Sequence, residues 1–228
     1  SKVLENDKAD PLYSNLSEIG HPIGQPFGLV AAGFFESEED IDNWYDQSLL
    51  GGRPIPGDVK YKDINGDNII DSNDQCAIGY TREPELVFGF GGTIEYKGFD
   101  FRIFFQGTLK RDKWLTGLNM WGADGGYWQS TCLKENMDYF RPADTDSYFG
   151  PNVNGYLPRP LLGASANNNK QVNSQYLQDA SYMRCKNIQL GYTFPKQWLQ
   201  KAMIQSLRLY VSMENLLTLT KYTGYTPD

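Results

Sequence analysis

The sequence predicts an all-β fold with a few short helices, in which antiparallel up-and-down strands are joined by connections of very unequal length. Three observations lead to this prediction. Aromatic residues make up 14% of the chain and 23 of its 228 residues are glycine, which suits strands and turns better than a helical bundle. Several segments alternate apolar and polar residues with a period of two. The connections between these segments are long and short in turn.

The alternating segments are predicted strands with one apolar and one polar face. In the run that begins at Phe99, for example, Phe101 and Ile103 alternate with Asp100 and Arg102. The four strong candidates are residues 85–96 and the runs that begin at residues 99, 187 and 206, and a weaker fifth candidate is residues 27–35. Each apolar face has to be buried against a second sheet or turned to lipid.

Helical signals are short. Ser37 is a candidate N-cap before an acidic first turn, which predicts a helix over residues 37–50 that ends at a glycine pair. Residues 129–140 and residues 195–203 are the other two candidates, and the latter has a proline near its first helical position.

The connections over residues 36–85 and 110–180 are long, whereas Lys97-Gly98 and residues 194–206 form short ones. Consecutive antiparallel strands place the long connections at one end and the short ones at the other, as in outer-membrane barrels with short periplasmic turns and long extracellular loops. Structureless loops beyond about 12–15 residues are uncommon in compact domains. The pattern therefore favours part of a transmembrane β-barrel, while a soluble β-sandwich with two long loops remains open.

On the barrel interpretation, an initial segment or loop over residues 1–26 precedes a partial barrel region over residues 27–228. A membrane barrel needs about eight strands or more. Because the sequence offers five strand candidates, the barrel of this chain would be incomplete and the chain would be a piece of a larger protein.

Composition argues against several classes of function. The net charge of -7 and the pI of about 4.8 argue against nucleic acid as a partner. Three cysteines without a C-x-x-C pair argue against a disulfide framework or a zinc site. His21 is the only histidine in the sequence and no paired-carboxylate site stands out, so we do not expect an enzyme.

Residues 63–74 have the ligand spacing of an EF-hand-type calcium loop. Oxygen-bearing side chains stand at loop positions 1, 3, 5, 9 and 12, and position 7 can offer its backbone carbonyl. Asn68 takes the sixth position, where the pattern has glycine, and the twelfth residue is Asp rather than Glu. Ile70 is expected to point away from the ion into a small apolar core. The predicted ligands of a structural Ca²⁺ are Asp63, Asn65, Asp67, Ile69, Asp71 and Asp74, and a solvated acidic turn is the alternative.

Four collinear stretches resemble a known family. Residues 56–67, PGDVKYKDINGD, running on to an Ile-Gly pair, resemble the signature of the SusC/RagA family of TonB-dependent outer-membrane transporters of Bacteroidetes. Residues 182–192, YMRCKNIQLGY, and residues 212–228, SMENLLTLTKYTGYTPD, are similar to two further segments of that family. Residues 20–24, GHPIG, resemble a fourth. The family commonly has Asp and Glu where this chain has Thr226 and Asp228.

The resemblance implies a barrel of about 22 strands in the cell outer membrane, filled by an N-terminal plug. It implies import of oligosaccharides or peptides, driven by TonB, with a SusD-like surface lipoprotein as a lid. This chain would be part of the C-terminal half of the barrel, in contact with outer-membrane lipid, and TonB would act through N-terminal parts that the chain lacks. The calcium-like loop would stiffen an extracellular loop.

The second long connection is rich in aromatic residues. Aromatic faces and planar polar side chains hold sugars, but Trp and Tyr also favour protein interfaces. The candidate contacts to a glycan or peptide substrate, or to the lid, are Trp114, Trp121, Tyr127 and Trp128. The rival function is a secreted, soluble β-rich carbohydrate-binding module with a structural calcium ion.

Overall fold

The structure is a computed structural model that describes residues 2–5, 12–115, 134–161, 167–200 and 204–224. The chain divides into two compact units. We call Ser1–Thr81 with Trp114–Leu177 the loop unit, and Arg82–Lys113 with Gln178–Asp228 the sheet unit. The long connections of the sequence thus belong mainly to the loop unit, and the four strongly alternating segments belong to the sheet unit.

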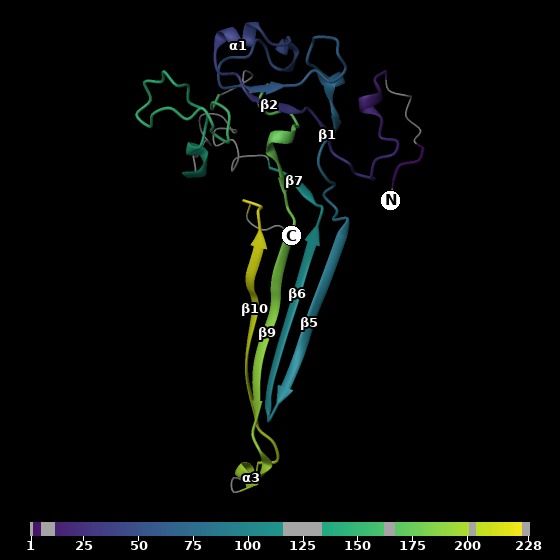
Figure 1. Cartoon of the computed structure of the whole chain (residues 1–228), viewed down its shortest axis with the longest axis vertical. Helices are drawn as coiled ribbons and strands as arrows, with labels where there is room; N and C mark the ends of the chain where they lie inside the picture. The colour runs from purple at the N-terminus through teal and green to yellow at the C-terminus, as the bar shows by residue number, and fades with distance from the viewer. Residues whose placement is uncertain (1, 6–11, 116–133, 162–166, 201–203, 225–228) are drawn as a thin grey trace, which may run out of the picture. The chain divides into compact units, whose positions relative to one another are not determined.

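The sheet unit is one four-stranded antiparallel sheet in the order β10-β9-β6-β5 (Figure 1). Its strands are β5 (Leu86–Tyr96), β6 (Phe99–Leu109), β9 (Tyr182–Thr193) and β10 (Arg208–Thr220). Lys97 and Gly98 join β5 to β6 with φ angles of 47° and 90°, which is the left-handed backbone that a two-residue hairpin turn requires. The predicted all-β fold, the four strong strand candidates and this turn are confirmed.

Alternation along the strands separates the sheet into two faces. Phe101 of β6 lies opposite Leu190 of β9, which lies opposite Val211 of β10, so apolar residues meet across three strands. One position away, Arg102 lies opposite Gln189, which puts polar residues on the other face. We call these the apolar face and the polar face of the sheet.

Strands β9 and β10 are longer than the alternation predicts because both carry irregularities. The β9–β10 register shifts between Glu214 and Leu217, where Asn215 has a positive φ of 52°. The β6–β9 register shifts between Phe104 and Phe105. A bulge inserts a residue and breaks the period of two, so the continuation of each strand is hidden in the sequence.

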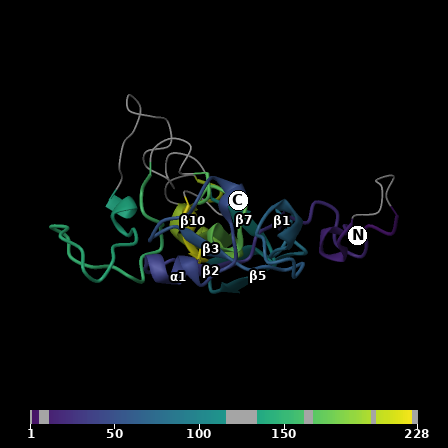
Figure 2. The ribbon, with the colours of Figure 1, turned by 90° about the horizontal axis from the view of Figure 1, so that it is seen from above.

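The loop unit contains short elements connected by turns. Strand β1 (Phe27–Gly28) pairs with β4 (Cys76–Ala77), and β2 (Ala31–Phe34) pairs with β3 (Val59–Tyr61), both antiparallel. β2 and β3 lie side by side in the view from above (Figure 2). The remaining elements are η1 (Ser14–Leu16), α1 (Glu38–Asp42), η2 (Ser48–Leu50), η3 (Ser72–Asp74), η4 (Lys134–Met137) and η6 (Ser174–Tyr176). Strands β7 (Asp112–Trp114) and β8 (Leu177–Asp179) pair with each other.

The candidate strand over residues 27–35 is divided into β1 and β2, which pair within the loop unit and do not join the four-stranded sheet. Ser37 does cap α1, because its hydroxyl accepts a hydrogen bond from the Asp40 amide at 3.2 Å. The helix nevertheless ends at Asp42 instead of continuing to residue 50, and the chain turns so that Gln47 enters the interior. In the candidate helix over residues 195–203, the described residues form α3 (Lys196–Leu199), and residues 201–203 lie outside the described residues.

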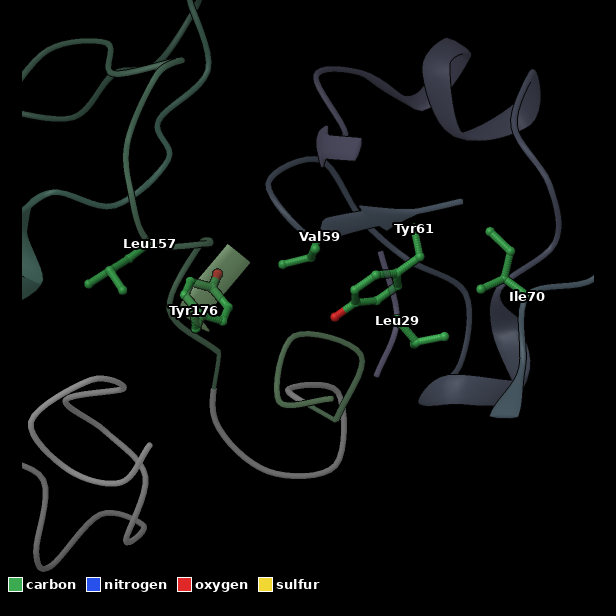
Figure 3. Packing of buried hydrophobic residues seen from close by; sticks show 6 residues of the cluster. All are labelled: Leu29, Val59, Tyr61, Ile70, Leu157 and Tyr176. Atoms are coloured by element: carbon green, nitrogen blue, oxygen red, sulfur yellow. The ribbon is translucent and has the colours of Figure 1, made fainter. Parts of the chain in front are cut away.

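A small core holds the loop unit together. Tyr61 and Tyr176 are fully buried, and their phenol pKa values are raised by burial. Each fully buried apolar side chain of this size contributes about 1.5–3 kcal/mol. The cluster draws on both long connections and consists of Leu29, Val59, Tyr61, Ile70, Leu157 and Tyr176 (Figure 3). Within the described residues, no helix is long and apolar enough to cross a membrane.

Candidate functional site

The first half of the calcium-like loop is shaped by Asp63. Its two carboxylate oxygens accept hydrogen bonds from the Gly66 amide at 2.7 Å and the Asn68 amide at 2.9 Å. Asn68, at the sixth loop position, has a φ of 68°, which is the left-handed backbone that Asn tolerates better than most residues. Asp67 similarly accepts the Ile69 amide at 2.9 Å. The loop coils around its own acidic side chains.

Asp74 closes the loop and is fully buried. One of its carboxylate oxygens accepts the Ile64 amide at 2.7 Å and the Asn65 amide at 3.2 Å, and the other accepts the Asp71 amide at 2.9 Å. The last residue of the loop therefore ties both ends of the loop together. A buried carboxylate is tolerated here because three backbone N–H groups replace its hydration.

Ile70 connects the loop to the core. Its side chain is buried in the cluster of Figure 3, as the loop pattern predicts. The Ile70 amide donates a hydrogen bond to the Asp46 carbonyl at 2.7 Å. The Asp46 carboxyl has a lowered pKa because it accepts hydrogen bonds from Ser48. The acidic loop is thus a packed part of the unit rather than a free surface turn.

The predicted calcium ligands fit the ion by chemistry, because hard oxygen donors are what Ca²⁺ prefers. In the described residues, however, no group of three or more His, Cys, Asp or Glu side chains gathers around a point where a metal could sit. The carboxylates of Asp63, Asp67, Asp71 and Asp74 instead accept hydrogen bonds from loop amides. Since a carboxylate oxygen has lone pairs for more than one partner, calcium binding by these residues stays a prediction.

Of the four candidate substrate or lid contacts, the structure places one. Trp114 is half-buried and packs against the core of the loop unit. Its indole N–H has no hydrogen-bond partner among the described residues. Trp121, Tyr127 and Trp128 lie outside the described residues. Substrate or lid contact by these four residues remains a prediction.

A buried polar network went unnoticed in the sequence. Gln47 is fully buried and donates hydrogen bonds from its amide nitrogen to the Val59 carbonyl at 2.9 Å and the Asn168 side-chain oxygen at 2.8 Å. The Asn169 side-chain oxygen accepts the Val59 amide at 2.8 Å. These side chains bond the backbone of β3 much as a neighbouring strand would. They join the two long connections over more than a hundred residues of sequence.

Asp58 adds an ionisable group to this network. It is almost fully buried, and one carboxylate oxygen accepts the Asn169 side-chain amide at 2.8 Å while the other accepts the Ile55 amide at 3.0 Å. Burial raises the pKa of the Asp58 carboxyl, and the hydrogen bond from Asn169 opposes that rise. Clustered Asn and Gln are ordinary loop residues in a sequence, so a pattern search has no signal for their partners.

The aromatic residues of residues 138–157 divide between packing and exposure. Phe140 is buried and lies 5.8 Å from Phe34, ring centre to ring centre. Tyr148 is 95% exposed and Phe149 is also exposed. Arg141 holds the base of this segment by donating to the Gly150 carbonyl at 2.6 Å. His21 stacks edge-on against Phe27 at 5.6 Å, consistent with a loop residue.

An ion pair marks the polar face of the sheet unit. Arg208 of β10 donates to Asp100 of β6, with Nε 3.0 Å from one carboxylate oxygen. Strand β9 lies between these two strands, and its Gly191 lies directly opposite Asp100. A Cβ at Gly191 would stand 2.5 Å from an Asp100 oxygen and 2.7 Å from an Arg208 nitrogen. The glycine lets the two charged side chains meet across the middle strand.

No family model matches the chain. The chain is 31% identical over 210 residues to TonB-dependent receptor P3 of Formosa agariphila, covering 92% of this chain and 19% of that protein. It is 26% identical over 206 residues to TonB-dependent receptor SusC of Bacteroides thetaiotaomicron, covering 88% of this chain and 17% of SusC. The chain thus spans about a fifth of the length of the curated relatives it matches.

The fold is similar to solved structures. The RagAB peptide importer in its open-open state matches with a TM-score of 0.57 at 18% identity, over 92% of this chain and 20% of that one. A structure of the RagAB peptide transporter matches with a TM-score of 0.58, over 89% of this chain and 20% of that one. At such identities the likeness concerns the fold alone. The antiparallel strands correspond to a fragment of the barrel of a TonB-dependent receptor.

Proposed function

The chain belongs to the SusC/RagA family of TonB-dependent receptors, and from this we propose that it forms part of the wall and surface loops of an outer-membrane importer. The importer would be driven through TonB and would work with a SusD-like surface lipoprotein as its lid. Its cargo would be an oligosaccharide or a peptide. The relatives are receptors and importers rather than enzymes, which supports a transport role.

The observation that carries the proposal is the exposure of the apolar face of the sheet. A soluble protein rarely leaves so large an apolar surface uncovered, whereas a barrel turns it to lipid. Strand β5 and strand β6 are each 11 residues long, which matches the roughly 9–11 tilted residues that cross a bilayer. The most exposed apolar side chains include Phe90, Ile94, Leu190, Leu209, Val211 and Met213.

The polar face of the sheet would line the interior of the barrel. It carries Asp100, Arg102 and Arg208, and charged side chains are inexpensive only where water or protein partners receive them. The Asp100–Arg208 ion pair would then link β6 to β10 across β9 on the inner side of the barrel wall. Alternation of lipid-facing and interior-facing residues thus gives each strand a double role.

Replacing Gly191 with Val should weaken the sheet by about 1–3 kcal/mol, because the new side chain would displace the Asp100–Arg208 ion pair above it. The matched control is Gly92→Val, since a Cβ at Gly92 meets nothing within 4 Å and Val favours strands. The unfolding midpoint of the full-length receptor in lipid vesicles measures both. Equal midpoints for the two variants would contradict the role assigned to Gly191.

We also propose that the loop over residues 63–74 binds a structural Ca²⁺ with the carboxylates of Asp63, Asp67, Asp71 and Asp74, the side chain of Asn65 and the carbonyl of Ile69. The oxygen-rich ligand set and the left-handed Asn68 support this. Binding would require carboxylate oxygens that now accept loop amides to turn toward, or to share a lone pair with, the ion. The ion's role would be to stiffen the loop.

Adding Ca²⁺ to the full-length receptor should slow amide hydrogen exchange in residues 63–74. At a free concentration 100 times the dissociation constant, binding stabilises the loop by about 2.7 kcal/mol, or roughly 100-fold in exchange rate. The double variant Asp63→Asn/Asp67→Asn should lose this response. The control is Asp144→Asn/Asp146→Asn, which removes two exposed charges elsewhere in the loop unit. Exchange that is equally fast in Ca²⁺ and in EDTA would leave the solvated acidic turn as the explanation.

The aromatic residues Trp114, Trp121, Tyr127 and Trp128 are proposed contacts to the substrate or the lid. Trp114 packs on the core of the loop unit, so its role would be to hold the aromatic connection in place. A paired tryptophan test separates the two roles: Trp121→Ala and Trp128→Ala should weaken cargo uptake or lipoprotein binding. Trp114→Ala should instead lower the stability of the loop unit.

The proposed function is tested with the full-length receptor and its neighbouring lipoprotein. We expect the receptor in the outer-membrane fraction, co-purification of the lipoprotein, and TonB-dependent uptake of a labelled oligosaccharide or peptide library. Uptake of one library and not the other would decide the cargo. A receptor that stays soluble and monomeric in buffer would overturn the proposal and favour the secreted carbohydrate-binding module.

A further inference from the structure

An aromatic row begins at one end of the apolar face of the sheet and continues past the end of its strands. Phe99 of β6 lies 4.5 Å from Tyr192 of β9, ring centre to ring centre, and Tyr192 lies 4.9 Å from Phe194. Phe194 lies 6.4 Å from Trp198, which belongs to α3 in the connection between β9 and β10. These four rings link two strands to a turn, and we call them the aromatic row.

The aromatic row stands at one edge of the apolar face. Tyr96, at the end of β5, lies directly opposite Phe99, so the hairpin turn follows at once. At the other end of the same two strands, Glu85 and Lys110 form an ion pair at 3.0 Å. Between this ion pair and the aromatic row, β5 and β6 each have 11 residues, which is the length of one bilayer crossing.

Trp198 is 65% exposed although it belongs to a turn with a buried side. The next residue, Leu199, is buried, so α3 packs inward through Leu199 and leaves Trp198 outside. A tryptophan with an apolar body and one polar N–H is best placed where hydrocarbon meets water. The short connections of a membrane barrel lie on its periplasmic side, which is where α3 would then sit.

Lysines accompany the aromatic row. The Lys97 ammonium lies 5.2 Å from the centre of the Tyr96 ring, in the turn between β5 and β6. Lys196, at the start of α3, is exposed. Positive charges beside interfacial aromatic rings complement lipid phosphates. The chemistry of this edge is therefore that of a surface that receives phospholipid headgroups.

We propose that α3 is an interfacial anchor: Trp198 inserts into the headgroup layer of the periplasmic leaflet, in line with the aromatic row, and Lys97 and Lys196 lie against its phosphates. This rests on the proposed membrane location of the sheet. The anchor fixes the depth of the apolar face, because moving the sheet outward would pull the indole through hydrocarbon and moving it inward would place apolar side chains in water.

Site-directed spin labels on the full-length receptor in phosphatidylethanolamine/phosphatidylglycerol vesicles test the depth. Single cysteines replace Trp198, Phe90 of the apolar face, and fully exposed Tyr148, in a background that carries Cys76→Ala, Cys132→Ala and Cys185→Ala. Collision rates with oxygen, which enriches in lipid, and with a water-soluble nickel chelate report the position of each label. A label at Gln197, the neighbour of Trp198 on the same turn, is the matched control because successive helical residues point about 100° apart.

We expect oxygen to dominate at position 90, the nickel chelate at position 148, and an intermediate ratio at position 198, with position 197 more aqueous than 198. If position 198 is as accessible to nickel as position 148, or as deep as position 90, the anchor is overturned while the membrane location stands. If position 90 itself behaves like position 148, the membrane location fails first. The two failures are therefore distinguishable.

Discussion

Replacing Asp74 with Ala should unfold the acidic loop of the loop unit locally, at a cost of about 3 kcal/mol. Its buried carboxylate accepts three backbone amides, those of Ile64, Asn65 and Asp71. Without it these N–H groups lose their partners, and both ends of the loop are released. Amide hydrogen exchange in residues 63–76 of the full-length receptor should accelerate roughly 100-fold.

Amide hydrogen exchange is measured in EDTA, so that the effect of the Asp74 hydrogen bonds is separated from any effect of calcium binding. Asp74→Asn keeps one oxygen acceptor and should lose less than Asp74→Ala. Asp144→Ala removes the same charge from an exposed site and should leave exchange in the loop unchanged. Exchange in Asp74→Ala that matches the Asp144→Ala control would contradict the closing role of Asp74.

Placing a charge on the apolar face should have an effect of similar size. Met213→Arg should destabilise the full-length receptor by about 2–4 kcal/mol, the cost of an arginine near the middle of a bilayer on a lipid-facing strand. Met213 is exposed and lies opposite Ile188 of β9, between the level of the aromatic row and that of the Glu85–Lys110 ion pair. Guanidinium unfolding in lipid vesicles measures the change.

Ser212→Arg is the matched control, because the preceding residue lies on the polar face, where it accepts a hydrogen bond from Asn187 at 3.3 Å. The control should cost less than half as much as Met213→Arg. If the two variants have the same unfolding midpoint, the sheet has no lipid-facing side, and the result favours the secreted, soluble carbohydrate-binding module. If the order is reversed, the faces have been assigned the wrong way round.

The strands were predictable because their alternation is a local property of the sequence. The strand predicted over residues 85–96 differs from the observed β5, Leu86–Tyr96, by one residue at its start. The turn at Lys97-Gly98 lies where it is predicted. The extension of β10 to Thr220 was missed because the irregularity at Asn215 interrupts the alternation. A local pattern cannot distinguish a strand that bulges from one that ends.

The loop unit was less predictable because its contacts are distant in sequence. The inward direction of Ile70 was predictable from the calcium-loop spacing. The partners of Gln47 did not follow, since Asn168 stands more than a hundred residues away. The helix from Ser37 was overextended because burying Gln47 overrides the local preference for helix. Tertiary packing decides such segments, and no periodicity announces it.

The amides of Asn168 and Asn169 have a consequence for how such proteins diversify. These side chains lie in the second long connection. They accept a hydrogen bond from the Val59 amide of β3 and donate one to its carbonyl. A chimaera that takes residues 167–176 from a relative without these asparagines would leave the Val59 amide without its Asn169 partner, although Gln47 would still donate to the Val59 carbonyl. Exchange of β3 alone would keep both contacts, because any residue except proline offers the same backbone N–H and C=O. The sequence of β3 should therefore be freer to vary between homologues than the two asparagines that bond its backbone.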